Sequence, residues 1–116
     1  MTNIDTEAHF RDVTEPLLAG AGVERSTMMG LPCLRLYGAF FASFDRRTGN
    51  LLVKLTEARV DELIATGRAE PFAPAGRRFR AWAAIPDRRH WTALLDDALA
   101  IAAAVPAKTP ARTRKR

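Results

Sequence analysis

Residues 34–45 alternate in side-chain character with a period of two, which is the pattern of a β-strand. Aromatic residues occur on both faces of this predicted strand, so neither face is typical of a sheet surface left in water. The stretch therefore predicts a strand in a sheet whose second face is covered as well. One face carries Leu34, Leu36, Gly38, Phe40, Ala42 and Phe44, and the other carries Arg35, Tyr37, Ala39, Phe41, Ser43 and Asp45.

Shorter stretches on either side predict the remaining strands of the sheet. A hairpin turn is predicted at 46–50, because Gly49 can adopt the positive φ that tight turns need. The two prolines of segment 70–76 confine it to a loop or a sheet edge. Strands are predicted over 23–33, which ends in a turn, over 51–55 and over 77–85. The last of these places Phe79, Ala81, Ala83 and Ile85 on one face and Arg78, Arg80, Trp82 and Ala84 on the other.

Three segments have helical patterns. The first begins at Asp5 or Thr6, and either kinks at Pro16 or gives way to a second short helix capped by Thr14. A further helix follows a cap at Thr56. The last, after Pro86-Asp87, carries an apolar stripe of Trp91, Leu94, Leu95, Ala98, Ile101 and Ala102. This order predicts an α+β fold, with a single twisted antiparallel sheet and helices packed on one face.

The net charge of +5 lies at one end of the chain. Residues 108–116 hold five of the 18 basic residues and none of the 13 acidic ones, so the rest of the chain is neutral. Because segment 106–116 is rich in cations and proline and offers little to bury, we expect a disordered basic tail there. Residues 1–105 are then one folded domain, of ordinary globular composition.

Several classes of protein are disfavoured by composition. Cys33 is the single cysteine, which excludes an internal disulfide and fits a reducing, cytoplasmic location. His9 and His90 are the only histidines, so no zinc-ligand spacing occurs, and we expect no metal or other cofactor. The polar, acidic N-terminal residues are not typical of a secretory signal, and no apolar run is long enough to span a membrane. Because no motif supplies a nucleophile with a base, we expect a protein that is not an enzyme.

A set of motifs spread over two-thirds of the chain points to a known family. In chain order they are Met28-Met29-Gly30, the hairpin 34–55, the helix 56–67, Gly67-Arg68-Ala69-Glu70-Pro71-Phe72, Gly76-Arg77, Trp82, Ile85-Pro86 and Trp91. With them, residues 28–102 resemble the N-terminal domain of the TfoX/Sxy competence-regulator family and the related MmcQ/YjbR proteins. The resemblance implies a fold like that of type III secretion chaperones, a twisted antiparallel sheet against helices. It also implies DNA binding, the label commonly given to YjbR-like members, and no catalytic residues.

Basic residues form the candidate nucleic-acid site. On the predicted strand 77–85, Arg78 and Arg80 share a face with Trp82, where guanidinium groups can hold phosphates while the indole stacks on a base. The alternative is a solvated face, on which arginine stems cover Trp82 and pair with acidic N-terminal residues. The candidates are Arg46, Arg47, Arg77, Arg78, Arg80, Trp82, Arg88 and Arg89 in the domain and Lys108, Arg112, Arg114, Lys115 and Arg116 in the tail. By themselves, the tail cations predict DNA or RNA binding without sequence preference.

A second hypothesis concerns protein partners. If the second face of the sheet is apolar, Tyr37 and Phe41 mark an interface for a homodimer or another protein, as in a chaperone-like module. Segment 70–76 of the same chain is the alternative cover for this face. The sequence thus leaves two functions open: a small cytoplasmic protein associated with nucleic acid, or a partner-binding module.

Overall fold

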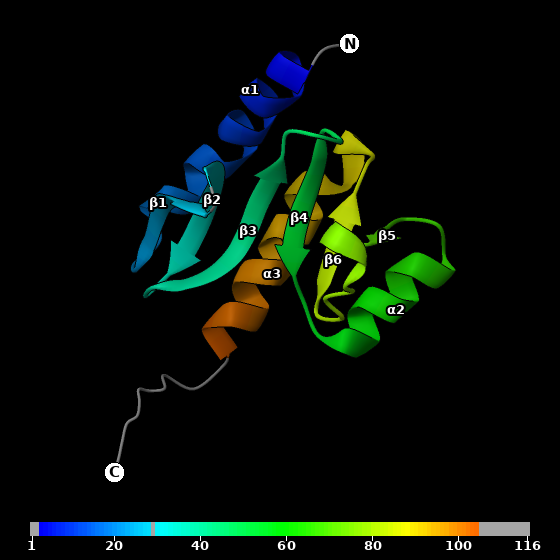
Figure 1. The fold of residues 1–116 in the computed structure, drawn as a ribbon. Helices are drawn as coiled ribbons and strands as arrows, with labels where there is room; N and C mark the ends of the chain where they lie inside the picture. Colours follow the sequence, from blue (N-terminus) through cyan, green and yellow to red (C-terminus); the bar gives the residue numbers. More distant parts are fainter. Residues whose placement is uncertain (1–2, 29, 105–116) are drawn as a thin grey trace.

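The computed structural model describes residues 3–28 and 30–104, and within them six strands form one antiparallel sheet (Figure 1). The strand order is β1-β2-β3-β4-β6-β5. The predicted α+β fold is therefore confirmed. The strands are β1 (Val23–Met28), β2 (Leu31–Leu36), β3 (Ala39–Asp45), β4 (Asn50–Lys54), β5 (Glu70–Pro71) and β6 (Trp82–Ile85).

Two long helices pack against the same side of this sheet. Helix α1 (Asn3–Thr14) touches the first turn of α3 (Trp91–Ala104), where the rings of His9 and Trp91 lie 5.4 Å apart. Helix α2 (Glu57–Ala65) packs beside the β6–β5 edge and reaches α3 through an ion pair between Arg59 and Asp97. In the described part of the chain, no helix has the length and apolar character needed to cross a membrane.

Local signals in the sequence explain where these helices begin. Thr56 accepts a hydrogen bond from the backbone N–H of Arg59, so it caps α2 as predicted. Asp87 likewise accepts from the N–H of Arg89, at the start of the 3₁₀ turn η3 (Arg88–His90) that leads into α3. At Pro16 a short 3₁₀ helix, η1 (Glu15–Ala19), follows α1. Thr14 does not cap it by its side chain, because its hydroxyl donates to the carbonyl of Phe10.

The predicted continuous strand over 34–45 is wrong, because a hairpin turn divides it. Strand β2 ends at Leu36, the turn contains Tyr37 and Gly38, and β3 begins at Ala39. Both turn residues have positive φ, 49° and 87°, as the tight two-residue turns between antiparallel strands require. Glycine adopts this conformation freely, whereas tyrosine rarely does. Gly38, at the second turn position, thus fits the usual sequence signal of such a turn, whereas Tyr37, at the first position, does not.

A β-bulge in the same hairpin reverses the predicted orientation of two phenylalanines. The register between β2 and β3 shifts between Leu34 and Arg35: Leu34 pairs with Ala42, and Arg35 pairs with Phe40. Phe41 is the additional residue, and it is buried in the core beside Ala42. The alternation that places Phe41 on the same face as Arg35 is therefore wrong, although Tyr37 and Phe41 both line one groove of the structure. Segment 70–76, the alternative cover for this face, does not cover Tyr37, which is 77% exposed.

The hydrophobic core lies between the sheet and the helices. Trp91 is its largest fully buried side chain, and its indole N–H donates to the carbonyl of Ile85 at 2.9 Å. The ring of Phe44 meets Trp91 edge-on, with 6.2 Å between centroids, and packs against Phe10 on its other side. The apolar stripe of α3 thus packs mainly against β3 and β4, and Trp91 at its start also reaches Ile85 of β6.

The predicted strand over 77–85 is shorter than expected. Strand β6 contains only Trp82–Ile85, and residues 77–81 form the irregular end of a loop. Strand β5, Glu70–Pro71, pairs with β6 at the sheet edge, as the prolines of segment 70–76 predict. Arg78 and Arg80 are therefore not on the strand that holds Trp82, and strand alternation no longer places them on its face.

Candidate functional site

The structure places the candidate arginines at two opposite ends of the sheet. Strand β6 lies antiparallel to β4, with Trp82 beside Lys54 and Ile85 beside Leu51. Arginines 77, 78 and 80 precede the first end of β6, whereas arginines 88 and 89 follow its other end, near the β3–β4 turn that holds arginines 46 and 47. With four strand residues between them, the two groups are about 13 Å or more apart along the sheet. They do not form one patch.

Three of these arginines are in ion pairs with acidic residues of the same chain. Arg46 Nε donates to Glu7 Oε1 at 2.8 Å, and Arg89 donates to Asp87 at 2.7 Å. Arg78 lies 3.3 Å from a carboxylate oxygen of Asp61. The hydrogen bond from Arg46 lowers the pKa of Glu7, and those from Arg89 hold the pKa of Asp87 well below its usual range. The charges of these three arginines are therefore offset within the domain.

The other members of the predicted cluster have different surroundings. Arg77 lies over the ring of Phe79, with 5.5 Å between its guanidinium carbon and the ring centroid, and Phe79 stacks on Phe72. Arg47 and Arg80 are exposed, and Arg88 is half-buried. The predicted tail cations, at 108–116, lie outside the described residues.

The sheet face that points away from α1 and α3, here called the outer face, holds a different set of residues. Arg35, Phe40, Lys54 and Trp82, one from each of four adjacent strands, form what we call the outer-face row. Arg35 pairs with Phe40 in the register, and Lys54 pairs with Trp82. Their sequence neighbours Leu34, Phe41, Val53, Leu55 and Ala83 all belong to the core on the other side.

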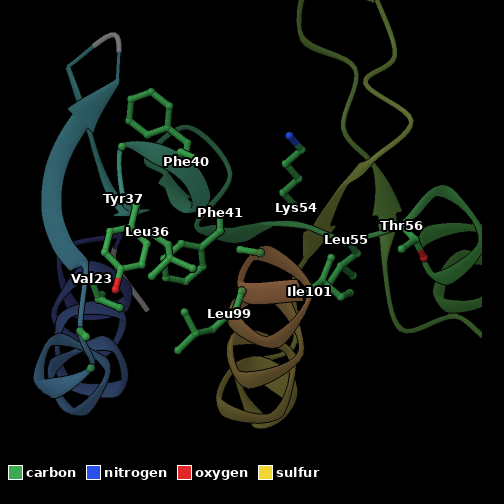
Figure 2. Close-up of a pocket in the computed structure, with 16 residues that line it drawn as sticks. Val23, Leu36, Tyr37, Phe40, Phe41, Lys54, Leu55, Thr56, Leu99 and Ile101 are labelled. Atoms are coloured by element: carbon green, nitrogen blue, oxygen red, sulfur yellow. The ribbon is translucent and has the colours of Figure 1, made fainter. Parts of the chain in front are cut away.

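Side chains of the outer-face row are accessible. Phe40 and Trp82 are half-buried, and Lys54 is exposed and forms no ion pair with any described residue. Arg35 lies 5.8 Å from the centroid of the Phe40 ring and also pairs with Glu24 at 3.2 Å. Figure 2 shows Phe40 and Lys54 on one side of the strands, opposite Leu99 and Ile101. The row thus offers two rings and at least one uncommitted cation.

A second row on the outer face is buried rather than accessible. Cys33, Ser43, Leu52 and Ala84 pair in sequence across the same four strands, and each is at most 5% exposed. Burial raises the pKa of the Cys33 thiol, against a smaller opposing effect of Arg35. Burial therefore disfavours the thiolate form that nucleophilic chemistry needs.

A groove of about 1100 Å³ opens between the turn at Gly20 and Ala21 and the last turns of α3, and it extends to Phe40 and Lys54 of the outer-face row. Leu36 and Phe41 lie at its base, and Leu99 and Ile101 line it from the helix (Figure 2). Tyr37, the other predicted interface residue, stands at its rim. Its ring lies so close to Gly22 that a Cβ at that position would be 2.5 Å from it.

Metal-ligating side chains are not gathered in residues 3–28 and 30–104. No cluster there contains three or more His, Cys, Asp or Glu side chains that could hold a metal ion. His90 lies 3.9 Å from Asp87, which Arg89 already engages. Among the described residues, the outer-face row offers accessible rings and cations, and the groove offers an open, mainly apolar surface.

Sequence reasoning found Trp82 but missed its neighbours in the row. Simple alternation could have placed Lys54 on the outer face, because its sequence neighbours Val53 and Leu55 are apolar and belong to the core. Alternation could not find Phe40, because the bulge turns Phe41 into the core and leaves Phe40 on the outer face. Comparison of the chain with protein-family models, with curated proteins and with solved structures gives no significant match.

Proposed function

We propose that the protein binds single-stranded nucleic acid on the outer face of its sheet, as a small, non-enzymatic protein of the cytoplasm. The observation that carries the proposal is the outer-face row, in which cationic and aromatic side chains alternate across four adjacent strands. Aromatic rings stack on unpaired bases of any sequence, and cations beside them contact the phosphates. Phe40 and Trp82 would supply the rings and Lys54 the main charge.

The dimensions of the row favour single strands over duplexes. Adjacent strands are about 4.8 Å apart, so four of them span about 14 Å, which suits two or three stacked nucleotides. Bases within a duplex are already stacked on each other and offer only their edges. An accessible row of rings therefore has more to gain from unpaired bases.

The basic tail would act separately from the row. Its five cations can neutralise phosphates of any sequence, which raises affinity without selecting the site. The domain itself is neutral, so its contribution has to come from local contacts rather than from net charge. Resemblance to YjbR-like proteins, which carry a DNA-binding label, supports an association with nucleic acid.

Replacing either ring of the row is expected to weaken binding to a labelled oligothymidylate of about 12 nucleotides by roughly tenfold. The reason is that each stacked base contributes about 1–3 kcal/mol. Fluorescence anisotropy of the full chain, with Trp82→Ala and with Phe40→Ala, measures this effect. Lys54→Gln is expected to weaken binding by about two- to fivefold. The matched control is Arg47→Gln, which removes an exposed cation at the opposite end of the sheet and leaves affinity within about twofold.

A variant with all five tail cations replaced by glutamine separates the tail from the domain. For a single strand, the slope of log affinity against log salt is expected to become shallower by about 3.5, or 0.7 for each cation. The effect of Trp82→Ala is expected to persist in this background. The proposal fails if the tail variant has no binding left at low salt, if Trp82→Ala binds like the parent chain, or if a duplex binds as tightly as the single strand.

A further inference from the structure

Two more aromatic residues continue the outer-face row beyond Trp82. Strand β5 pairs with the side of β6 that faces away from β4, and Phe72 directly follows β5. The N–H of Phe79 donates to the carbonyl of Phe72 at 2.9 Å, and the N–H of Trp82 donates to the carbonyl of Phe79 at 3.1 Å. The second bond closes a β-turn, so the Cα atoms of Phe79 and Trp82 are at most about 7 Å apart. Phe72 and Phe79 therefore lie next to Trp82, on its far side from Lys54.

These two rings and one arginine form a continuous stack. The rings of Phe72 and Phe79 are stacked, with 5.7 Å between centroids and 29° between planes. The guanidinium carbon of Arg77 lies 5.5 Å from the centroid of the Phe79 ring. We call these three residues the loop stack. Phe79 is 38% exposed, so part of its ring is open to a ligand.

The loop that carries the stack is held in one conformation by its own backbone. Gly76 donates to the carbonyl of Ala73, and Arg77 donates to that of Pro74, within the 3₁₀ turn η2 (Pro74–Gly76). Ala75 and Gly76 both have positive φ, 55° and 82°, which reverses the chain at this point. In Figure 2 the segment that leads into β6 rises on the side of Phe40 and Lys54, opposite α3. A ring fixed in this way loses little conformational freedom when it binds.

The charges around the loop stack favour an anionic group beside Arg77. Arg77 is not ion-paired with any of the described residues, whereas its neighbour Arg78 lies 3.3 Å from Asp61 of α2. Glu70, the acid of β5, pairs with Ala84 and so belongs to the second row, about 7 Å along the strand from the outer-face row. The loop stack thus repeats the combination of ring and cation that Trp82 and Lys54 provide.

On the basis of the proposed single-strand binding, we infer that Phe79 stacks on a third unpaired base and that Arg77 contacts the phosphate beside it. Phe40 and Trp82 are two strand spacings apart, about 10 Å, with Lys54 between them. Phe79 follows Trp82 at a similar or shorter distance, and rings and guanidinium planes stack on unpaired bases. The ligand of the site is therefore a run of at least three unpaired nucleotides rather than a mono- or dinucleotide.

Three substitutions of Phe79 in the full chain test the third base position by anisotropy of the labelled oligothymidylate of about 12 nucleotides. Phe79→Ala and Phe79→Leu are expected to weaken binding about tenfold, because one stacked base is lost. Phe79→Tyr keeps a ring and is expected to bind within about twofold of the parent chain. Leucine still packs on Phe72, so it would satisfy a ring that served only to hold the loop. Phe79 lies outside the hydrophobic core, so these variants keep the fold, which circular dichroism verifies.

Adjacent arginines give a matched pair for the phosphate contact. Arg77→Gln is expected to weaken binding about two- to fivefold and to make the slope of log affinity against log salt shallower by about 0.7. Arg78→Gln removes a cation that Asp61 already engages, and it is expected to leave affinity within about twofold.

A series of unlabelled oligothymidylates of two to six nucleotides, competing with the labelled strand, tests the length of the ligand. For the parent chain, the trinucleotide is expected to compete about tenfold better than the dinucleotide, because it reaches the third ring. In Phe79→Leu this step is expected to disappear.

The outcomes separate this inference from the proposed function. If Trp82→Ala weakens binding but Phe79→Leu binds like the parent chain, the third position does not exist and the outer-face row stands alone. Equal losses in Phe79→Tyr and Phe79→Leu would also overturn the inference, because the ring would not be what matters. If the parent chain does not bind the oligothymidylate, or if Trp82→Ala has no effect, the proposed function fails and the inference fails with it.

Discussion

Replacing Trp91 by alanine is expected to lower the free energy of unfolding by about 3–5 kcal/mol, the cost of removing a large buried aromatic side chain. Trp91 is completely buried between the rings of Phe44 and His9. The substitution also leaves the Ile85 carbonyl without the indole N–H that it accepts at 2.9 Å. Since domains of this size are stable by about 5–15 kcal/mol, the melting temperature should fall by about 15 °C or more.

Trp91→Phe is the control that separates packing from hydrogen bonding. It keeps a ring in the core but removes the donor to Ile85, so a smaller loss of about 1–3 kcal/mol is expected. Urea denaturation followed by circular dichroism measures both variants. A loss below about 1 kcal/mol for Trp91→Ala would contradict the position of α3 against β3 and β6.

Phe41→Ala is expected to destabilise the protein by about 3–5 kcal/mol, whereas Phe40→Ala is expected to cost about 1 kcal/mol or less. The two residues are adjacent in the sequence, and only the bulge between β2 and β3 decides which one enters the core. Phe41 is 1% exposed and Phe40 is half-buried on the outer face. The same pair of variants therefore tests the register of the whole hairpin.

Urea denaturation of Phe41→Ala and Phe40→Ala measures the loss in the free energy of unfolding for each variant. If the strand ran without a bulge, as simple alternation over 34–45 predicts, the order of the two losses would be reversed. Equal losses would also contradict the structure. The expected order supports the outer-face row as well, because Phe40 can take part in it only if Phe41 lies in the core.

Elements with strong local signals could be predicted from the sequence. The cap at Thr56, the turn containing Gly49 and the apolar stripe from Trp91 to Ala98 each depend on neighbouring residues, and each is present in the structure. Alternation also gave the correct faces of β6, with Trp82 and Ala84 opposite Ala83 and Ile85. In these elements, local preference and tertiary packing agree.

The parts that could not be predicted depend on the pairing between strands. Tyr37 occupies a turn position with φ of 49°, which its side chain does not favour, so the turn has no clear sequence signal. The bulge opposite Arg35 arises from the register of β2 against β3 and leaves no mark in the sequence of either strand. Likewise, only the topology shows that the arginines before and after β6 lie at opposite ends of the sheet.

The most direct test of single-strand binding on the outer face is the intrinsic fluorescence of the two tryptophans during titration with an unlabelled oligothymidylate. Trp91 is buried, so a base can stack only on Trp82. We expect saturable quenching at the concentrations at which anisotropy reports binding, and its loss in Trp82→Phe. Binding that leaves the fluorescence of the parent chain unchanged would contradict the account, because contacts would then lie elsewhere than on the outer-face row.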